Sequence, residues 1–303
     1  MPLPDSGVVI KRTRSFYYVD VGEASPRLCR IRGNLFESSK YDQRVAVGDH
    51  VRIDLNASED AGWILEILPR HTKLSRRSRE GETEQILVTN AEVLMIVAAL
   101  RRPEFRSGMV DRMIVAALRG GLRPLLVLNK CDLASEEIWA PIREVYESLG
   151  YEVLRTSATQ AIGLQELRDR LQGKTTVLSG HSGVGKSSLI KALYPDWSIR
   201  VGDVNRKVGK GRHTTVLAEM FALPESGYLV DTPGIRELEP FGVTRETLGQ
   251  YFVEFTPFEG QCRFARCSHQ HEPDCAVKEA LGSGAILQRR YESFVALWES
   301  LEA

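Results

Sequence analysis

A glycine-rich loop in the middle of the chain restricts how its central part can fold. The loop reads Gly180-His181-Ser182-Gly183-Val184-Gly185-Lys186-Ser187 and fits the pattern G-x-x-x-x-G-K-[ST]. It lies between an apolar run at 175–178 and a helical stretch at 188–193, as a phosphate-binding loop requires. Its glycines let successive backbone N–H groups face phosphate oxygens at the start of a helix. We expect the whole loop and Ser188 to bind a nucleotide, with Lys186 bridging the β- and γ-phosphates and Ser187 ligating Mg²⁺.

The tetrapeptide Asn129-Lys130-Cys131-Asp132 favours guanine as the base of that nucleotide. It follows the apolar run 124–128, and an aspartate at a strand end can accept two parallel hydrogen bonds from the N1–H and N2–H₂ edge of guanine. Asn129 is expected to support the base edge and the loop, and Lys130 to cover the ring with its aliphatic stem. A further run ends in the small residues Ser157 and Ala158, whose backbone can approach the guanine O6.

Two downstream segments offer groups for magnesium and the γ-phosphate. In the element Asp231-Thr232-Pro233-Gly234, Asp231 is expected to hold Mg²⁺ through water and the Gly234 N–H to sense the γ-phosphate. The glycine- and base-rich loop 206–215 ends in two threonines, either of which can cap the metal. The predicted magnesium ligands are therefore Ser187, Asp231 and Thr215, with Thr214 as the alternative to Thr215. Loops that order on the γ-phosphate are the switching elements of GTPases.

The residue after the D-x-x-G element bears on hydrolysis. It is Ile235, whereas many GTPases carry a glutamine there that orients the attacking water. We expect slow intrinsic turnover and stimulation by a partner. His213 is the nearest candidate catalytic residue to orient water, and the alternative is a histidine that only binds the backbone of its loop.

The motifs stand in an unusual order. The guanine-reading tetrapeptide precedes the phosphate loop, whereas Ras-like GTPases begin with the phosphate loop. The order predicts a circularly permuted GTPase, whose site stays intact if the joined ends are neighbours in space. We expect the γ-phosphate state to set the pose of both flanking domains.

Composition and pattern divide the chain of 303 residues into four segments. With 43% hydrophobic residues, 40 basic residues and 40 acidic ones, wholesale disorder and a uniformly basic nucleic-acid binder are excluded. Residues 1–70 are short β-rich runs and predict an OB-fold barrel, with an SH3-like barrel as the alternative. Residues 71–83 are predicted to form a basic linker. Residues 84–245 alternate apolar runs with helical stretches and predict an α/β domain with a largely parallel sheet.

The fourth segment, 246–303, carries a cysteine cluster and a predicted C-terminal helix. Its Cys262, Cys267, His269 and Cys275 form C-x4-C-x-H-x5-C, a closed tetrahedral set for one structural Zn²⁺ per chain. The alternatives are free buried cysteines or a redox pair, with His271 as another possible ligand. With four ligands the ion has no open position, so no chemistry is assigned to it.

The same patterns bear on contacts with membranes and with RNA. The run 93–100 is among the longest apolar stretches and has eight residues, so no membrane span is expected, and the N-terminal segment lacks a hydrophobic signal core. We expect a cytoplasmic monomer. Residues 8–21 are predicted to form one strand, in which Lys11, Arg12 and Arg14 precede Phe16, Tyr17 and Tyr18, a mixture suited to RNA.

These motifs together resemble the bacterial ribosome small subunit-dependent GTPase A family, also called RsgA or YjeQ. The resemblance covers nearly the whole chain: the N-terminal barrel, N-K-x-D before the phosphate loop, the G-x-H-T-T loop, and C-x4-C-x-H-x5-C followed by a helix. It implies a late-acting assembly factor that binds the small ribosomal subunit and its rRNA. It further implies that the subunit stimulates hydrolysis of GTP to GDP and phosphate, after which the factor leaves.

Two other functions remain open at this point. One is a GTPase that acts on protein partners, such as a metallochaperone whose zinc site handles cargo. The other is a non-catalytic RNA-binding module that holds a guanine nucleotide only as a structural ligand.

Overall fold

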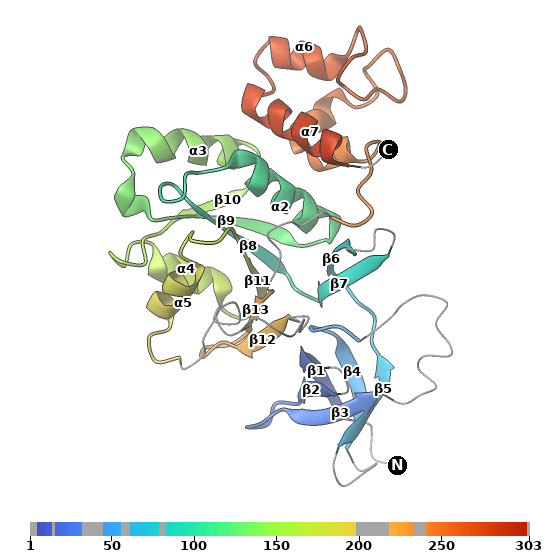
Figure 1. Cartoon of the computed structure of the whole chain (residues 1–303), viewed down its shortest axis with the longest axis vertical. Coiled ribbons are helices and arrows are strands. Elements are labelled where there is room, and N and C mark those ends of the chain that lie inside the picture. Colours follow the sequence, from blue (N-terminus) through green and yellow to red (C-terminus); the bar gives the residue numbers. More distant parts are fainter. Residues whose placement is uncertain are drawn as a thin grey trace, which may run out of the picture.

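The computed structural model describes residues 5–13, 16–31, 45–55, 61–78, 83–197, 218–232 and 240–301. Three bodies follow one another along the long axis of the molecule: a β-barrel, an α/β body and a helical domain (Figure 1). The multidomain architecture predicted from the sequence is confirmed. Among the described residues, every helix falls short of the length and apolar character that a bilayer span needs.

The N-terminal barrel is a closed five-stranded sheet. Pairing runs in the order β1-β2-β3-β5-β4, and β4 pairs with β1 again, which closes the barrel and confirms the OB-type expectation. β3 and β5 are parallel, and the other pairs are antiparallel. Alternate side chains of these strands, including Val9, Val19 and Ile53, point inward and are fully buried. The strands are β1 Asp5–Arg12, β2 Tyr17–Asp20, β3 Arg27–Ile31, β4 His50–Asp54 and β5 Gly62–Ile67.

The prediction of a single strand over 8–21 is wrong, because the segment folds back into the β1–β2 hairpin. At the turn, the Thr13 backbone N–H donates to the Phe16 carbonyl at 2.8 Å. The pairing register sets Lys11 opposite Tyr18 and Arg12 opposite Tyr17. The basic and aromatic residues are therefore cross-strand neighbours on two strands.

The segment expected to be a basic linker forms part of a second, two-stranded sheet. In it, β6 (Lys73–Arg77) pairs antiparallel with β7 (Glu84–Thr89). A fully buried carboxylate, Asp49, ties this sheet to the barrel. It accepts hydrogen bonds from Nε and a terminal nitrogen of Arg70, both at 2.7 Å, and from the Thr89 hydroxyl at 2.8 Å. The bidentate geometry fixes how the barrel sits against β6 and β7.

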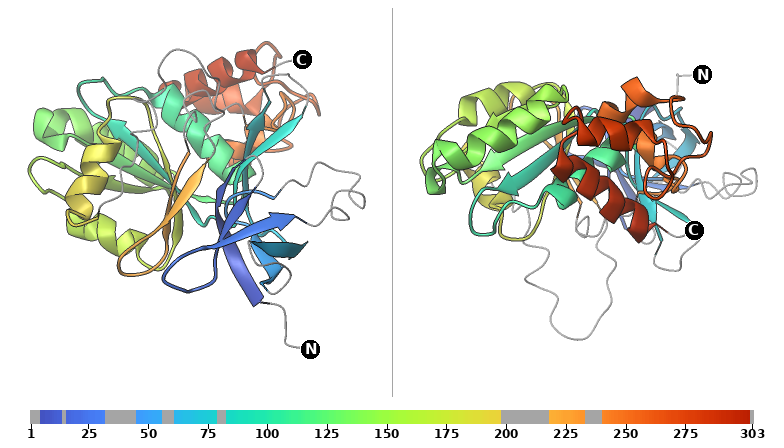
Figure 2. Two further views of the ribbon diagram at one scale, coloured as in Figure 1. Left: turned by 60° about the horizontal axis from the view of Figure 1, so that its bottom comes forward. Right: turned by 90° about the horizontal axis from the view of Figure 1, so that it is seen from above.

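The α/β body is built on a six-stranded sheet in the order β10-β9-β8-β11-β13-β12. All neighbours are parallel except β12, which the sequence pattern did not predict. β12 also pairs with β1 of the barrel, where Lys11 forms an ion pair with Glu219 at 2.6 Å, so the two sheets are continuous (Figure 2). The strands are β8 Val93–Ala99, β9 Arg123–Asn129, β10 Glu152–Arg155, β11 Thr175–Ser179, β12 Glu219–Ala222 and β13 Tyr228–Asp231.

Helices cover both faces of this sheet, as expected for buried parallel strands. On β8, Leu94 and Ile96 pack toward α2 (Ser107–Arg119) and α3 (Glu136–Ser148). The alternate residues Met95 and Val97 pack toward α4 (Leu164–Leu171) and α5 (Lys186–Leu193). Because both faces are buried, β8 is apolar throughout and all seven of its residues are buried.

The C-terminal domain lies on α2, as Figure 1 and Figure 2 show. Its core contains Phe252, Phe255 and Phe294, whose rings lie 4.9 to 5.5 Å apart. The predicted terminal helix is present as α7. The elements are η4 Leu248–Tyr251, η5 Val253–Phe258, α6 Ala276–Gly282 and α7 Gln288–Ser300.

A buried ion cluster joins this domain to the α/β body. Arg290 of α7 donates to Asp111 of α2 at 2.5 Å and to both carboxylate oxygens of Glu254 at 2.6 and 3.2 Å. The Tyr146 hydroxyl of α3 also donates to Asp111, at 2.9 Å. Arg290 is 1% exposed and Asp111 is fully buried, and this burial raises the pKa of the Asp111 carboxyl. The charges are thus paired across the domain boundary, away from water.

Candidate nucleotide site and metal centre

The carboxyl ends of the parallel strands bring the predicted nucleotide motifs together. β9 ends at Asn129, β11 runs into the loop that starts at Gly180, and β13 ends at Asp231. β10 leads into Ser157 on the same edge, since β10 is parallel to β9. Ligands of open α/β sheets bind at this edge. The motifs that the sequence separates by about a hundred residues therefore share one edge of one sheet.

The phosphate loop has the backbone shape that its glycines predict. Gly180, Gly183 and Gly185 all have positive φ, and Gly185 directly precedes α5. A Cβ on Gly180 would lie 2.3 Å from the Val97 carbonyl oxygen, and one on Gly185 would lie 2.5 Å from Nδ2 of Asn129. A side chain would therefore collide with backbone at Gly180 and with the buried Asn129 side chain at Gly185, and both positions also have positive φ. Lys186 at the start of α5 donates to the carbonyls of Gly180 and His181 at 2.7 and 3.0 Å, so it spans the loop.

Asn129 and Lys130 fasten the guanine-reading segment to the phosphate loop. Nδ2 of Asn129 donates to the Val184 carbonyl at 2.8 Å, and its Oδ1 accepts from the Thr156 hydroxyl at 3.1 Å. Nζ of Lys130 donates to the Gly183 carbonyl at 2.6 Å and to the carbonyl of Arg102. Asn129 therefore links the end of β9 to the phosphate loop and to Thr156. The contact of Lys130 with Arg102 carries no signal in the sequence.

Asp132 is exposed at the mouth of this site. Ser157 donates its hydroxyl to Oδ1 of Asp132 at 2.5 Å, and Thr159 donates to Oδ2 at 3.4 Å. Ser157 itself is buried, and an antiparallel bridge with Ile162 fixes its backbone. The segment after β10 thus orients the Asp132 carboxylate through a side chain, an interaction that the sequence reasoning had not assigned to Ser157.

The remaining predicted nucleotide residues fall into two groups. Ser187 and Ser188 are exposed in the first turn of α5, Asp231 is half-buried at the end of β13, and Ala158 is half-buried beside Ser157. These positions share the carboxyl edge. The others lie outside the described residues: His213, Thr214, Thr215 and Gly234.

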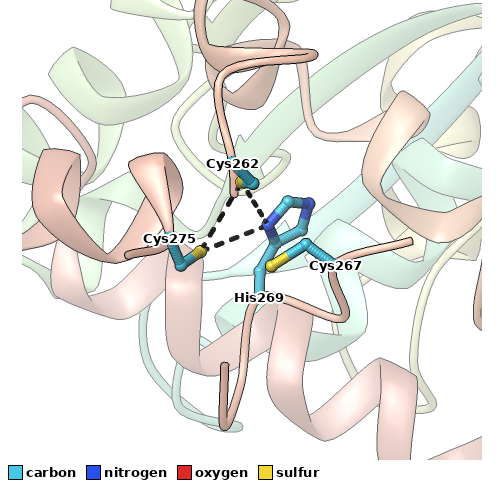
Figure 3. A group of neighbouring side chains, drawn as sticks. All are labelled: Cys262, Cys267, His269 and Cys275. Carbon is cyan, nitrogen blue, oxygen red and sulfur yellow. Dashed lines mark hydrogen bonds between the residues drawn. The ribbon is translucent and has the colours of Figure 1, made fainter. Parts of the chain in front are cut away.

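The four predicted metal ligands converge in the C-terminal domain (Figure 3). Their ligand atoms all lie within 4.8 Å of one another. Sγ of Cys262 lies 3.6 Å from Nδ1 of His269 and 3.9 Å from Sγ of Cys275, and Nδ1 of His269 lies 3.4 Å from Sγ of Cys275. Tetrahedral ligands at zinc-to-sulfur distance are roughly 3.8 Å apart. The cluster therefore fits one four-coordinate metal ion.

Surrounding groups hold these ligands in place. Tyr291 of α7 donates its hydroxyl to the His269 carbonyl at 2.6 Å, and the rings of Phe255 and Phe294 lie beside the imidazole. Burial raises the pKa of Cys267 to about 12 and lowers the pKa of His269. A neutral imidazole is ready to bind a cation, and a thiol in this setting ionises when a cation replaces its proton.

Glu272 shapes the turn between His269 and Cys275. Its carboxylate accepts from the backbone N–H and hydroxyl of Ser268 at 2.8 and 2.9 Å, and from the Gln270 backbone at 3.3 Å. Partial burial raises the pKa of Glu272, but these hydrogen bonds outweigh burial and bring the pKa to about 2. The turn is therefore held by a carboxylate that stays ionised at neutral pH.

Comparisons with known proteins match this organisation along the whole chain. The model of the RsgA GTPase family matches residues 67–241, and that of the RsgA N-terminal domain matches residues 6–64. Proteins named small ribosomal subunit biogenesis GTPase RsgA are similar: that of Chlorobaculum tepidum is 40% identical over 98% of both chains, and that of Gemmatimonas aurantiaca is 39% identical over 99% of both.

Two solved structures share the fold. YjeQ from Thermotoga maritima has a TM-score of 0.80 and 32% identity, with 99% of both chains covered. YloQ, described as a circularly permuted GTPase, has a TM-score of 0.73 and 27% identity, covering 99% of this chain and 95% of its own.

Proposed function

The chain belongs to the RsgA GTPase family, and we propose that it hydrolyses GTP to GDP and phosphate while acting in the late maturation of the small ribosomal subunit. The observation that carries the proposal is the meeting of Asp132 and the Gly180–Ser187 loop at one sheet edge, through the Lys130–Gly183 and Asn129–Val184 contacts. The curated relatives are named for biogenesis of the small subunit. The proposed partners are the subunit and its rRNA, and the protein is proposed to act as a cytoplasmic monomer.

Guanine recognition is assigned to Asp132. A carboxylate has about four lone-pair positions, so Asp132 can accept from Ser157 and still receive the N1–H and N2–H₂ groups of the base. The Ser157 hydrogen bond holds the carboxylate in one orientation before the base arrives. The aliphatic stem of Lys130, anchored at Gly183, would lie over the ring.

Phosphate binding is assigned to the loop and Lys186. The ammonium of Lys186 already lies at the loop, so phosphate oxygens can replace the Gly180 and His181 carbonyls as its partners. GTP would bring Mg²⁺, for which Ser187 and Asp231 are the proposed ligands among the described residues, with Thr215 or Thr214 beyond them. When bound, Mg²⁺ would neutralise the negative charge that develops on the phosphates. His213 remains the proposed residue that orients water.

The cluster of Cys262, Cys267, His269 and Cys275 is proposed to hold zinc. Three sulfurs and one imidazole nitrogen suit Zn²⁺ among the common metals. A zinc ion held by these four residues would stabilise the turn between them and would have no coordination position left for a substrate. This supports a structural metal and speaks against cargo handling by a metallochaperone.

The test is phosphate release from GTP with and without purified small subunits, for the wild type and Lys186→Ala. We expect slow release alone, faster release with subunits, and loss of both in the variant. Wild-type hydrolysis that subunits leave unchanged would contradict the subunit-dependent part. Undiminished release by Lys186→Ala would contradict the assignment of the site.

A further inference from the structure

A hollow of about 490 Å³ lies beside the nucleotide edge and has no place in the site described so far. Its walls come from the loop between β8 and α2 and from the residue after Asp132. None of the side chains assigned to the nucleotide lines it. The lining residues are Arg101, Arg102, Pro103, Glu104 and Leu133.

The wall of this hollow is in direct contact with both nucleotide motifs. Lys130 joins the Arg102 carbonyl to the Gly183 carbonyl of the phosphate loop. A Cβ on Gly183 would lie 3.8 Å from the Pro103 ring, so the two loops pass close to each other. Arg102 has a φ of 52°, a left-handed conformation that a non-glycine residue adopts only when its surroundings enforce it.

The hollow carries positive charge and an apolar surface. Arg101 and Arg102 are both exposed. The ion pair between Arg101 and Glu104 is 3.6 Å long, and the Glu104 side chain is 83% exposed, so it neutralises Arg101 weakly. Leu133 is 44% exposed, one of three large apolar side chains that are exposed in the described part of the chain. Arginine forks beside an apolar surface suit a phosphate with its sugar or base.

We propose that this hollow binds the phosphodiester backbone of RNA in the small ribosomal subunit, with Arg101 and Arg102 as the phosphate contacts. The inference rests on the proposed function, which supplies a partner containing RNA. RNA bound here touches the loop whose Arg102 carbonyl holds Lys130, and Lys130 in turn holds the phosphate loop. A single residue, Lys130, then connects the RNA-binding loop to the loop that binds the nucleotide phosphates. Loss of the two charges impairs subunit-dependent hydrolysis and leaves nucleotide binding intact.

The test compares Arg101→Gln/Arg102→Gln with a control that removes the same charge elsewhere, Arg143→Gln/Arg289→Gln. Glutamine keeps the backbone carbonyl of residue 102 and much of the side-chain length. Arg143 on α3 is 47% exposed and bonded to Glu147, which matches the 46% exposure and acidic partner of Arg101, and Arg289 is exposed on α7. Phosphate release is measured against subunit concentration at several salt concentrations, together with basal hydrolysis and affinity for a fluorescent GDP analogue.

We expect the hollow variant to need about a hundredfold more subunits for half-maximal stimulation, because each of the two lost charged hydrogen bonds is worth about a factor of ten. In a plot of log affinity for the subunit against log salt concentration, the slope should become less steep by about one unit per lost phosphate contact. Basal hydrolysis and GDP affinity should stay within about twofold of the wild type, and so should all properties of the control.

Three results would overturn the inference. Equal behaviour of the two double variants would leave the hollow without a specific role. Weaker GDP binding with normal stimulation would assign the hollow to the nucleotide site. A photo-crosslinker at the exposed position 104, Glu104→p-benzoylphenylalanine, should yield an RNA adduct on the subunit, and a protein adduct or none would count against an RNA partner. If subunits fail to stimulate the wild type, the proposed function itself fails, which is a separate outcome.

Discussion

Arg290→Met should detach the C-terminal domain from α2 more severely than any exposed substitution in α7. Arg290 is 1% exposed and makes hydrogen bonds to Asp111 and Glu254, and its guanidinium carbon lies 4.7 Å above the Phe252 ring. Methionine leaves the buried Asp111 and the nearly buried Glu254 without a counter-charge. Removal of one partner of a buried ion pair costs about 3–5 kcal/mol. We therefore expect Arg290→Met to weaken the attachment of the C-terminal domain to α2 by about 3–5 kcal/mol.

The assay is urea unfolding followed by tryptophan fluorescence, since Trp298 lies in α7. The C-terminal transition should move down by about 1 M urea or more, at a slope of up to about 3 kcal/mol per M. Arg289→Met, at the exposed neighbouring position, should stay within about 0.5 kcal/mol of the wild type. Identical midpoints for the two variants would refute the argument from buried charge.

The same variant makes a pH prediction with a definite sign. Burial already raises the pKa of Asp111 above its ordinary value, and loss of Arg290 removes the cation that opposes the rise. The folded state then binds a proton more tightly than the unfolded state, so stability increases as the pH falls from neutral toward the ordinary carboxyl pKa. The difference in unfolding free energy between Arg290→Met and Arg289→Met should therefore become smaller in mild acid. A difference that grows as the pH falls would contradict this.

Three further changes test other parts of the molecule. Gly185→Ala should weaken binding of a fluorescent GDP analogue at least about tenfold, because its Cβ would meet Asn129 at 2.5 Å. The control Gly282→Ala, which has open space around it, should bind the analogue normally. Equal binding by the two variants would contradict the loop geometry. Asp49→Ala should destabilise the barrel by about 3 kcal/mol in thermal unfolding, because it removes the buried carboxylate that accepts two hydrogen bonds from Arg70. An unchanged melting temperature would argue against that junction. Zinc added to the metal-free protein at neutral pH should release at least the two protons of Cys267 and Cys275, because burial raises the pKa of both thiols. Calorimetry in buffers of different ionisation enthalpy should detect these protons. Zinc binding without proton release would contradict coordination by thiolates.

Much of the site followed from the sequence because parallel sheets place strand ends together. Once the runs before Asn129, Gly180 and Asp231 are taken as parallel strands of one sheet, the motifs must meet at one edge, whatever their order along the chain. The metal cluster could equally be predicted from the sequence, because four ligands within fourteen residues can bind one ion. These predictions needed only local pattern and topology.

The rest depended on contacts that carry no periodic signal. The β1–β12 pairing is one short register between Lys11 and Glu219, and β12 is only four residues long. Arg290 looks like an ordinary helix-surface arginine until the fold brings α7 onto Asp111. The Arg102 carbonyl is a backbone group, so its contact with Lys130 leaves no trace in residue type. Pairing between distant segments, rather than local preference, decided each of these.

Nucleotide selectivity offers the sharpest single test, by calorimetric titration of GTP, ATP and xanthosine triphosphate into the wild type and Asp132→Asn. The wild type should bind GTP at least about a hundredfold more tightly than ATP, since a carboxylate left unpaired by adenine is penalised. Asparagine offers a donor where guanine also donates, so the variant should lose GTP and gain the xanthine nucleotide. Comparable ATP binding by the wild type, or unchanged GTP preference in the variant, would contradict the assignment of one guanine site to Asp132 and the Gly180–Ser187 loop.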